Sequence, residues 1–240
     1  MNQATQTIRQ KLATRPHLAQ WCQATKDLFN TVAAFYFDVL QVHSAVLDLN
    51  DTGALTALER LTHATRKNPH PVMPLSEVTR DVPAFFRRAA IHAALGSARS
   101  FSRHLCKWRA QKAKAEARKK AFHKRPPVPP RTWRKVYAGM YKERTDGTIL
   151  LKLWTGSSWA WIKCQIGRRR LPEGWEAASP SLVEKAGTWW LHTPITTQFE
   201  GPGKVVDQLH SCEVRICAVA LGQGRPPPKQ DRHLCRGRAG

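Results

Sequence analysis

Residues 81–130 read DVPAFFRRAAIHAALGSARSFSRHLCKWRAQKAKAEARKKAFHKRPPVPP. Asp81 is a suitable N-cap, and Pro83 suits a first helical turn, where its missing N–H is harmless. The pattern predicts one helix from about Val82 to Phe122, which would be about 60 Å long at 1.5 Å per residue. The five-residue run Pro126–Pro130 then predicts a stiff, extended linker. Apolar residues suited to packing occupy the first half of the helix, namely Phe85, Phe86, Ala89, Ala93 and Leu95.

The second half of this predicted helix has almost no apolar face and carries charge of a single sign. Residues 87–135 contain sixteen Lys and Arg but one acid, Glu116, so +15 of the chain's formal +22 lies there. Like charges four residues apart destabilise a free helix, and a polyphosphate partner would relieve that repulsion. The alternative is a merely solvated face. The predicted nucleic-acid-binding residues are Arg87, Arg88, Arg99, Arg103, Lys107, Trp108, Arg109, Lys112, Lys119, Lys120, Arg131 and Arg134.

Arg99, Arg103 and Lys107 recur every four residues, which predicts a stripe that follows a phosphate backbone without reading bases. Trp108 lies among these cations. Two roles stay open for its ring, namely packing within the helical region and stacking on a base.

On the N-terminal side of this segment the sequence predicts a short strand over residues 4–13 and two helices, Leu18–Leu47 and Leu55–His63. The first helix has an apolar face at spacings of three and four, made of Leu28, Val32, Phe35, Val39 and Val42, which predicts a packed core. Prolines between residues 69 and 74 then interrupt regular structure.

On the C-terminal side the sequence pattern becomes typical of strands, and these predict a small antiparallel barrel or sandwich. The tryptophans of these strands are expected mostly in its core, with base stacking as the alternative. Residues 171–184 look like a loop that holds Glu173, Glu176 and Glu184 at the surface. The expected strands are Lys135–Lys142, Thr148–Trp154, Trp159–Ile166, Thr188–Ile195 and the apolar run Val214–Val219.

The composition favours a polyanionic partner. The chain has 240 residues, with 39 Lys and Arg against 17 Asp and Glu, and such a field attracts nucleic acid. No apolar run approaches the roughly 20 residues of a membrane span, and the N-terminus lacks a signal-peptide core. None of the six cysteines forms a C-x-x-C pair, so zinc spacing is absent and a reducing cytoplasm is expected.

Several segments resemble the N-terminal half of TnpB-type (OrfB) insertion-sequence transposases, which are related to type V CRISPR effectors. The similarity follows segment order over roughly residues 5–220. It implies an α+β fold, in which a helical recognition region (15–130) is inserted in an antiparallel β-barrel, wedge-like domain (1–14 and 131–213). A remnant RuvC-type strand (214–221) and a disordered tail (222–240) would follow. The segments are LFNTVAAFYFDVLQVH, ALTALERLTH, VPAFFRRAAIHAALGSARSF, KRPPVPPRTW, YAGMYKERTDG, WTGSSWAWIKC and TWWLHTPI.

The resemblance implies RNA and DNA as partners and Mg²⁺ as the family's cofactor. Ala220 stands where the family's first metal-binding aspartate is expected, and alanine offers no oxygen ligand. We therefore expect a truncated family member, shortened near Val219 by frameshift or decay. It would bind guide RNA and DNA without cofactor or cleavage, in a cytoplasmic, nucleoid-associated setting. The alternatives are a stand-alone basic RNA-binding module and a non-functional transposon remnant.

Overall fold

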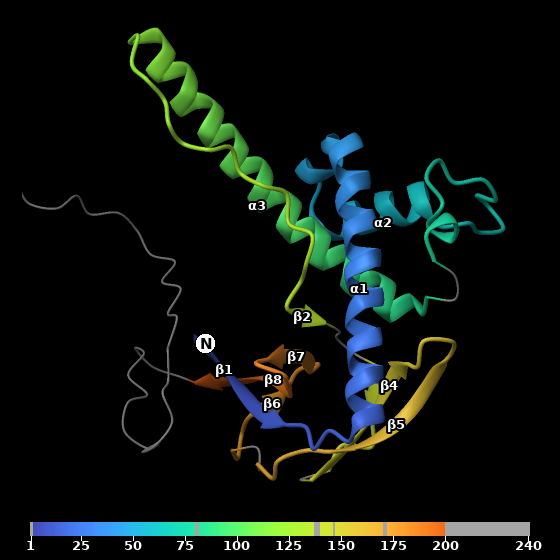
Figure 1. Cartoon of the computed structure of the whole chain (residues 1–240). Coiled ribbons are helices and arrows are strands. Elements are labelled where there is room, and N and C mark those ends of the chain that lie inside the picture. The colour runs from blue at the N-terminus through green and yellow to red at the C-terminus, as the bar shows by residue number, and fades with distance from the viewer. Residues whose placement is uncertain (1, 80–81, 137–139, 146, 170–171, 200–240) are drawn as a thin grey trace, which may run out of the picture. The chain divides into compact units, whose positions relative to one another are not determined.

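The computed structural model describes residues 2–79, 82–136, 140–145, 147–169 and 172–199 (Figure 1). Three α-helices occupy the first half of the chain: α1 (Pro16–Val42), α2 (Asp51–Thr62) and α3 (Ala84–Ala117). Short 3₁₀ turns, η1 (Ser44–Asp48) and η2 (Leu75–Glu77), connect them. The strands come before and after the helices, so the fold is of the α+β class.

The helix boundaries differ from the prediction where capping decides them. Asn50 caps α2 because its side chain accepts a hydrogen bond from the Gly53 N–H at 2.7 Å, so α2 begins earlier than Leu55. Pro83, with no side-chain capping bond, precedes α3, and the predicted cap Asp81 lies outside the described residues. The long helix ends at Ala117 instead of Phe122.

The helices share one core, in which the aromatic side chains of α1 and α3 interlock. Phe29 of α1 meets Phe86 of α3 edge to face at 5.4 Å between ring centroids, and Phe37 meets Phe101 at 5.8 Å. Val32 and Val39 are fully buried as predicted, but Val42 is 68% exposed because α1 ends there. Phe85 is also exposed, in contrast to the prediction, since only Phe86 of that pair faces α1.

All the strands of the described residues pair antiparallel, and they form two sheets. The first has the order β1-β8-β7-β2, built from β1 (Asn2–Lys11), β8 (Thr188–Phe199), β7 (Ser181–Lys185) and β2 (Lys135–Val136), with β6 (Glu176–Ala177) also pairing β8. The second has the order β3-β4-β5, built from β3 (Tyr141–Lys142), β4 (Thr148–Trp154) and β5 (Trp159–Gln165).

Strand β1 connects the two sheets. It pairs with β8 along its whole length, from Asn2 opposite Phe199 to Lys11 opposite Trp190. Just beyond β1, Leu12 bridges Ile166 and the Ala13 N–H donates to the Gln165 carbonyl at 3.0 Å. The two sheets do not close into a barrel within the described residues. The helices are thus inserted between the first strand and its partner β8.

A second core fills the space between the sheets and the start of α1. Leu151 and Leu153 of β4 pack there with Leu191 of β8 and Leu12. The Thr25 hydroxyl of α1 accepts a hydrogen bond from the Trp154 N–H at 2.9 Å, which ties the helical region to the second sheet.

No helix in the described part of the chain has the length and apolarity to cross a membrane. The predicted strand Val214–Val219, Ala220 and the tail 222–240 lie outside the described residues.

Candidate nucleic-acid interface

The predicted binding residues at the start of α3 are engaged within the protein. Glu59 of α2 accepts hydrogen bonds from Arg87 Nη2 at 3.3 Å and from Arg88 Nε at 3.0 Å. The Arg87 side chain is only 9% exposed. Burial acts to raise the pKa of Glu59, but the hydrogen bonds and charges of Arg88 and Arg87 outweigh it and lower that pKa. Arg87 and Arg88 are therefore structural cations rather than free phosphate ligands.

The sequence contained a signal for the position of Arg87. Ile91, Ala94 and Ala98 follow it at intervals of four, seven and eleven residues, and all three are fully buried. A residue in this register lies on the buried face of the helix. The number of basic residues in the segment does not reveal this position, because it does not say which face of the helix carries each residue.

Arg99 is likewise held by the protein. Its Nε donates to the Leu47 carbonyl at 3.1 Å, its Nη2 to the Leu49 carbonyl, and its Nη1 to Asp51 at 2.6 Å. The guanidinium thus joins the end of η1 to the start of α2. The first member of the predicted stripe is a structural clamp.

Arg131 pairs with Asp38 of α1, whose two carboxylate oxygens lie 2.9 Å from its Nη1. Both side chains are more than half exposed, so this pair is weak. It places the segment after α3 beside α1. Arg134, the last predicted site residue, is exposed.

Beyond Ala98, no residue of α3 is buried, and beyond Arg99 the cations of the helix are exposed. At 100° per residue, three of these cations and Arg118, the C-cap residue, fall within one sector of about 60°. These four, hereafter the phosphate stripe, are Arg103, Lys107, Lys114 and Arg118, all exposed. None of the four has a carboxylate partner within the described residues. Lys114 and Arg118 were not among the predicted site residues, and the predicted stripe at intervals of four ended at Lys107.

The remaining predicted cations of this region are also exposed. Arg109 and Lys112 lie on other sides of α3, and Lys112 is 3.7 Å from Glu116, one turn further along the helix. Lys119 and Lys120 follow the end of α3. Their charges oppose the partial negative charge at the helix C-terminus, which stabilises the helix even without a ligand.

The helix ends in a hydrogen-bonded reversal. The Lys119 N–H donates to the Glu116 carbonyl and the Lys120 N–H to the Ala115 carbonyl, both at 2.9 Å. This is the Schellman pattern, which usually has glycine at the position that Lys119 occupies. Lys119 adopts φ 50° there, a conformation that costs about 1–2 kcal/mol for a residue with a Cβ.

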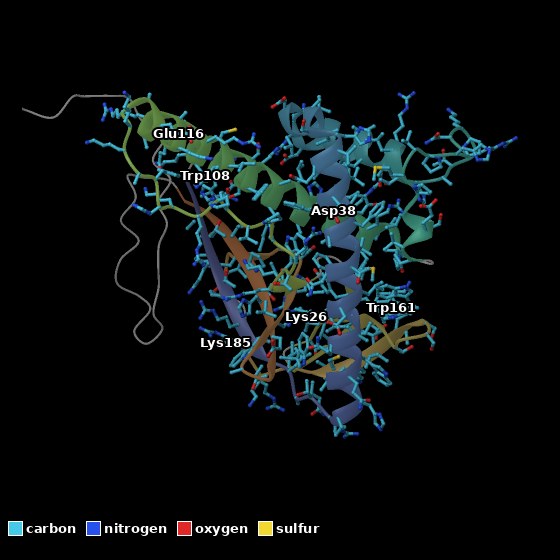
Figure 2. The ribbon with its side chains drawn as sticks, turned by 45° about the horizontal axis from the view of Figure 1, so that its top comes forward. Lys26, Asp38, Trp108, Glu116, Trp161 and Lys185 are labelled. Carbon is cyan, nitrogen blue, oxygen red and sulfur yellow. The ribbon has the colours of Figure 1, made fainter. Side chains whose placement is uncertain are left out.

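The reversal sends residues 118–131, hereafter the return segment, back along α3 (Figure 1). Trp108 fixes it, since its indole N–H donates to the Lys124 carbonyl at 2.8 Å and its ring meets Phe122 edge to face at 5.8 Å. In the first half of α3, the Ser97 hydroxyl accepts a hydrogen bond from the indole N–H of Trp133, just after the return segment, at 2.9 Å. Figure 2 labels Trp108 and Glu116 on the second half of α3. The extended, proline-containing segment is thus attached along the helix.

Trp108 therefore packs against the return segment, and packing was the first of its two predicted roles. It lies in a half-buried stripe with Leu105, Gln111 and Ala115. The sequence predicted almost no apolar face on the second half of the helix, and the structure has only this narrow stripe there, which contacts the return segment at Trp108.

The described residues show no candidate site for metal binding or for cysteine chemistry. No group of three or more His, Cys, Asp and Glu side chains gathers there in a way that would hold a metal ion. Burial raises the pKa of the Cys164 thiol to about 11, and burial, with a smaller contribution from Cys164, also raises that of Cys22. Both cysteines are core residues.

No curated protein matches the chain. A family model, however, matches residues 6–155, from β1 through all three helices and the return segment to the end of β4. This match covers more than half of the 240 residues. The chain belongs to the Aq_aa04 family.

Proposed function

We propose that the protein binds the sugar–phosphate backbone of nucleic acid through the distal half of α3. The observation that carries the proposal is the phosphate stripe, four exposed cations on one face of a helix, none paired with a carboxylate in the described residues. The cations at the base of the helix, Arg87, Arg88 and Arg99, are instead paired. The unpaired charge of the helix is therefore concentrated beyond Arg99.

The dimensions of the stripe suit a polyanion. Arg103 and Arg118 are fifteen residues apart, or about 22 Å along the helix axis. One nucleic-acid strand places a phosphate about every 3.4 Å along a duplex axis, so four contacts fit within this length. Phosphate contacts of this kind position a protein without reading sequence.

The salt dependence of binding tests the proposal. Four neutralised phosphates give a slope of about −3.6 for log K against log salt on duplex DNA, or about a 150-fold loss between 50 and 200 mM. Replacing Arg103, Lys107, Lys114 and Arg118 by Gln should remove most of that slope. Fluorescence anisotropy with a labelled duplex at several salt concentrations measures both quantities.

A control variant with the same charge change separates a local site from the general field of the protein. Arg15, Arg60, Arg66 and Lys67 are exposed and lie outside α3, and replacing them by Gln also removes four charges. This control should keep most of the slope. If both variants lose equal affinity, or if the stripe variant binds as the parent does, the stripe is only a solvated face.

The resemblance to TnpB-type proteins extends the proposal to guide-like RNA and DNA as the partners, in a nucleoid-associated setting, and to a wedge-like role for the two sheets. The pairing of β1 with β8 supports it, because the resemblance implies a helical region inserted after the first strand. The alternative, a stand-alone basic module of other ancestry, does not require β1 (Asn2–Lys11) to pair in that sheet. Sequencing the RNA that co-purifies with the protein tests this identity.

We also propose that binding is not accompanied by cleavage. Ala220 cannot ligate Mg²⁺ at the position where the resemblance implies an aspartate. Purified protein incubated with Mg²⁺ and labelled substrate should cut no more than a mock purification does. Metal-dependent cutting above that background would contradict this proposal and leave the binding proposal intact.

A further inference from the structure

The outward face of the second sheet carries an exposed tryptophan among lysines. Trp161 of β5 is 43% exposed and is the one tryptophan among the exposed large hydrophobic side chains of the described residues. The Lys142 ammonium of β3 lies 4.5 Å from the centre of its ring and that of Lys152 of β4 lies 6.0 Å away. Figure 2 labels Trp161 beside the β4–β5 hairpin.

The strand register explains this arrangement. Lys152 is directly opposite Trp161, and in the next row Lys142, Leu150 and Lys163 follow one another across the three strands. Side chains two apart on a strand point to the same face, so Lys163 lies on the same side as Trp161. We call Trp161, Lys142, Lys152 and Lys163 the Trp161 patch.

The other strand positions on this face add no negative charge. They are Thr148, Trp154, Trp159 and Gln165. Trp159 packs against Phe86 at 5.0 Å between ring centroids and against Trp154 at 5.6 Å, so this end of the face joins the helical core. Trp161 is one step beyond it, where the side chains enter solvent.

We propose that the Trp161 patch binds single-stranded nucleic acid, with an unpaired base stacked on the Trp161 ring and the neighbouring phosphates held by Lys142, Lys152 and Lys163. An exposed aromatic ring in a positive surface suits an unpaired, polyanionic chain, because every base has a face that stacks. This inference rests on the proposed function, from which it takes the class of partner. It places a second contact with that partner on the β3-β4-β5 sheet instead of on α3.

The competing role of the lysines is to cover the ring. An exposed cation–π contact contributes about 2- to 5-fold to an equilibrium, whereas one stacked base contributes about 5- to 150-fold. A base can therefore displace Lys142 from the ring, and the freed ammonium gains a phosphate. An acidic peptide offers the charge but not the stacking surface, so the exposed ring favours nucleic acid.

Substitutions at Trp161 test the proposal by comparing unpaired and paired probes. Trp161→Leu keeps an apolar side chain but removes the aromatic face, and Trp161→Phe keeps a smaller one. With an oligouridylate of about 12 nucleotides, within the range of known single-strand sites, the Leu variant should bind about 5- to 150-fold more weakly than the parent. The Phe variant should lie between the two. With a fully paired RNA duplex, the three proteins should bind alike, because its bases are already stacked.

Phe85→Leu is the matched control. Phe85 is 66% exposed and lies outside both proposed surfaces, so its replacement should change neither affinity. Equal oligouridylate binding by the parent and the Leu variant overturns the inference, as does an equal loss on both probes. Competition by polyglutamate as effective as that by oligouridylate would assign the patch to an acidic protein partner and also overturn it.

The two proposals fail separately. If the phosphate-stripe variant binds duplex as tightly as the parent, the proposed function fails whatever Trp161 does. If the stripe variant weakens duplex binding while the Trp161 variants change nothing, only this inference fails. Thermal unfolding of each variant confirms that it is folded before binding is compared.

Discussion

Replacing Glu59 by Gln should destabilise the protein by leaving two arginines without their counter-charge. Arg87 and Arg88 both donate to the same Glu59 oxygen, at 3.3 and 3.0 Å. The Arg87 side chain is 9% exposed and its Nε has no partner in the described residues. Gln cannot neutralise the buried guanidinium, so its desolvation is no longer compensated.

The exposure of the partners sets the size of this effect. Breaking a fully buried pair costs about 3–5 kcal/mol. Here Glu59 is 23% and Arg88 51% exposed, so water screens part of the interaction, and we expect a loss of about 2 kcal/mol. This corresponds to a fall in Tm of about 4–8 °C for a chain of this size.

Urea denaturation of the parent and Glu59→Gln measures the free energy of unfolding directly. The double variant Glu59→Gln with Arg87→Met should recover part of the lost free energy of unfolding, because it no longer leaves the Arg87 charge buried without its counter-charge. Arg131→Gln is the control, since its pair with Asp38 is more than half exposed and should contribute less than about 0.5 kcal/mol. A loss below about 0.5 kcal/mol for Glu59→Gln, equal to that of the control, would refute the reasoning.

The difference between parent and Glu59→Gln should also depend on pH. The folded protein holds the pKa of Glu59 below its ordinary value of 4.5. A carboxyl with a lowered folded pKa contributes stability that is present above its unfolded pKa and is lost as the pH falls through its folded pKa. The two proteins should therefore approach each other in stability as the pH falls below 4.5, and a constant difference down to pH 3 would argue against the ion pair.

Three further outcomes follow from the described contacts. Trp108→Ala removes the bond to Lys124 and the contact with Phe122; trypsin should then cut faster within residues 118–125, with single-strand binding unchanged. Lys119→Gly relieves the φ of 50° and should raise the Tm by a few degrees, for about 1 kcal/mol; an unchanged or lower Tm would count against strain. Burial, then Arg9, Lys135 and Lys185, lower the pKa of His192 from 6.5, so stability is fully present above pH 6.5 and falls below it. His192→Gln should flatten that acid slope in urea denaturation.

The local elements were predictable where one physical signal dominates. The predicted strand Thr148–Trp154 matches β4 residue for residue, because it begins directly after the Asp146-Gly147 hairpin signal and its apolar residues Ile149, Leu151 and Leu153 share one face. Strand β7, Ser181–Lys185, lies largely within a segment predicted to be a loop. Its strand character depends on pairing with β8, which places Leu182 opposite Leu191 and Val183 opposite Trp190. Such pairing is a tertiary property that five residues do not reveal.

The sequence was enough to predict where the candidate site lies, but not which residues belong to it. The concentration of basic residues points to α3, yet Arg99 binds Asp51, 48 residues earlier, a contact that no local pattern predicts. The pairing of Glu184 with Lys26 at 3.2 Å was missed in the same way, since Glu184 was expected at the surface. Acidic residues on other elements decide which of the basic residues stay available.

The kind of cation changes along α3 and the return segment, and this change fits the proposed backbone binding by the distal half of α3. Five cations of α3 and the return segment pair with carboxylates. Four of them are arginines, Arg87, Arg88, Arg99 and Arg131, and the fifth is Lys112, in an exposed contact with Glu116. Arginine suits such sites because its planar group donates to several acceptors in fixed directions, as Arg99 does. Between Arg103 and Arg125, by contrast, the chain has six lysines and four arginines. A lysine ammonium acts as a compact charge with little directional demand, which matches phosphates whose positions shift with the conformation of the bound strand. Replacing Lys107 and Lys114 by Arg should therefore preserve the affinity and the salt slope, whereas Arg99→Lys should lower the Tm. A large loss of affinity in the first variant would mean that the stripe recognises a fixed geometry instead of charge.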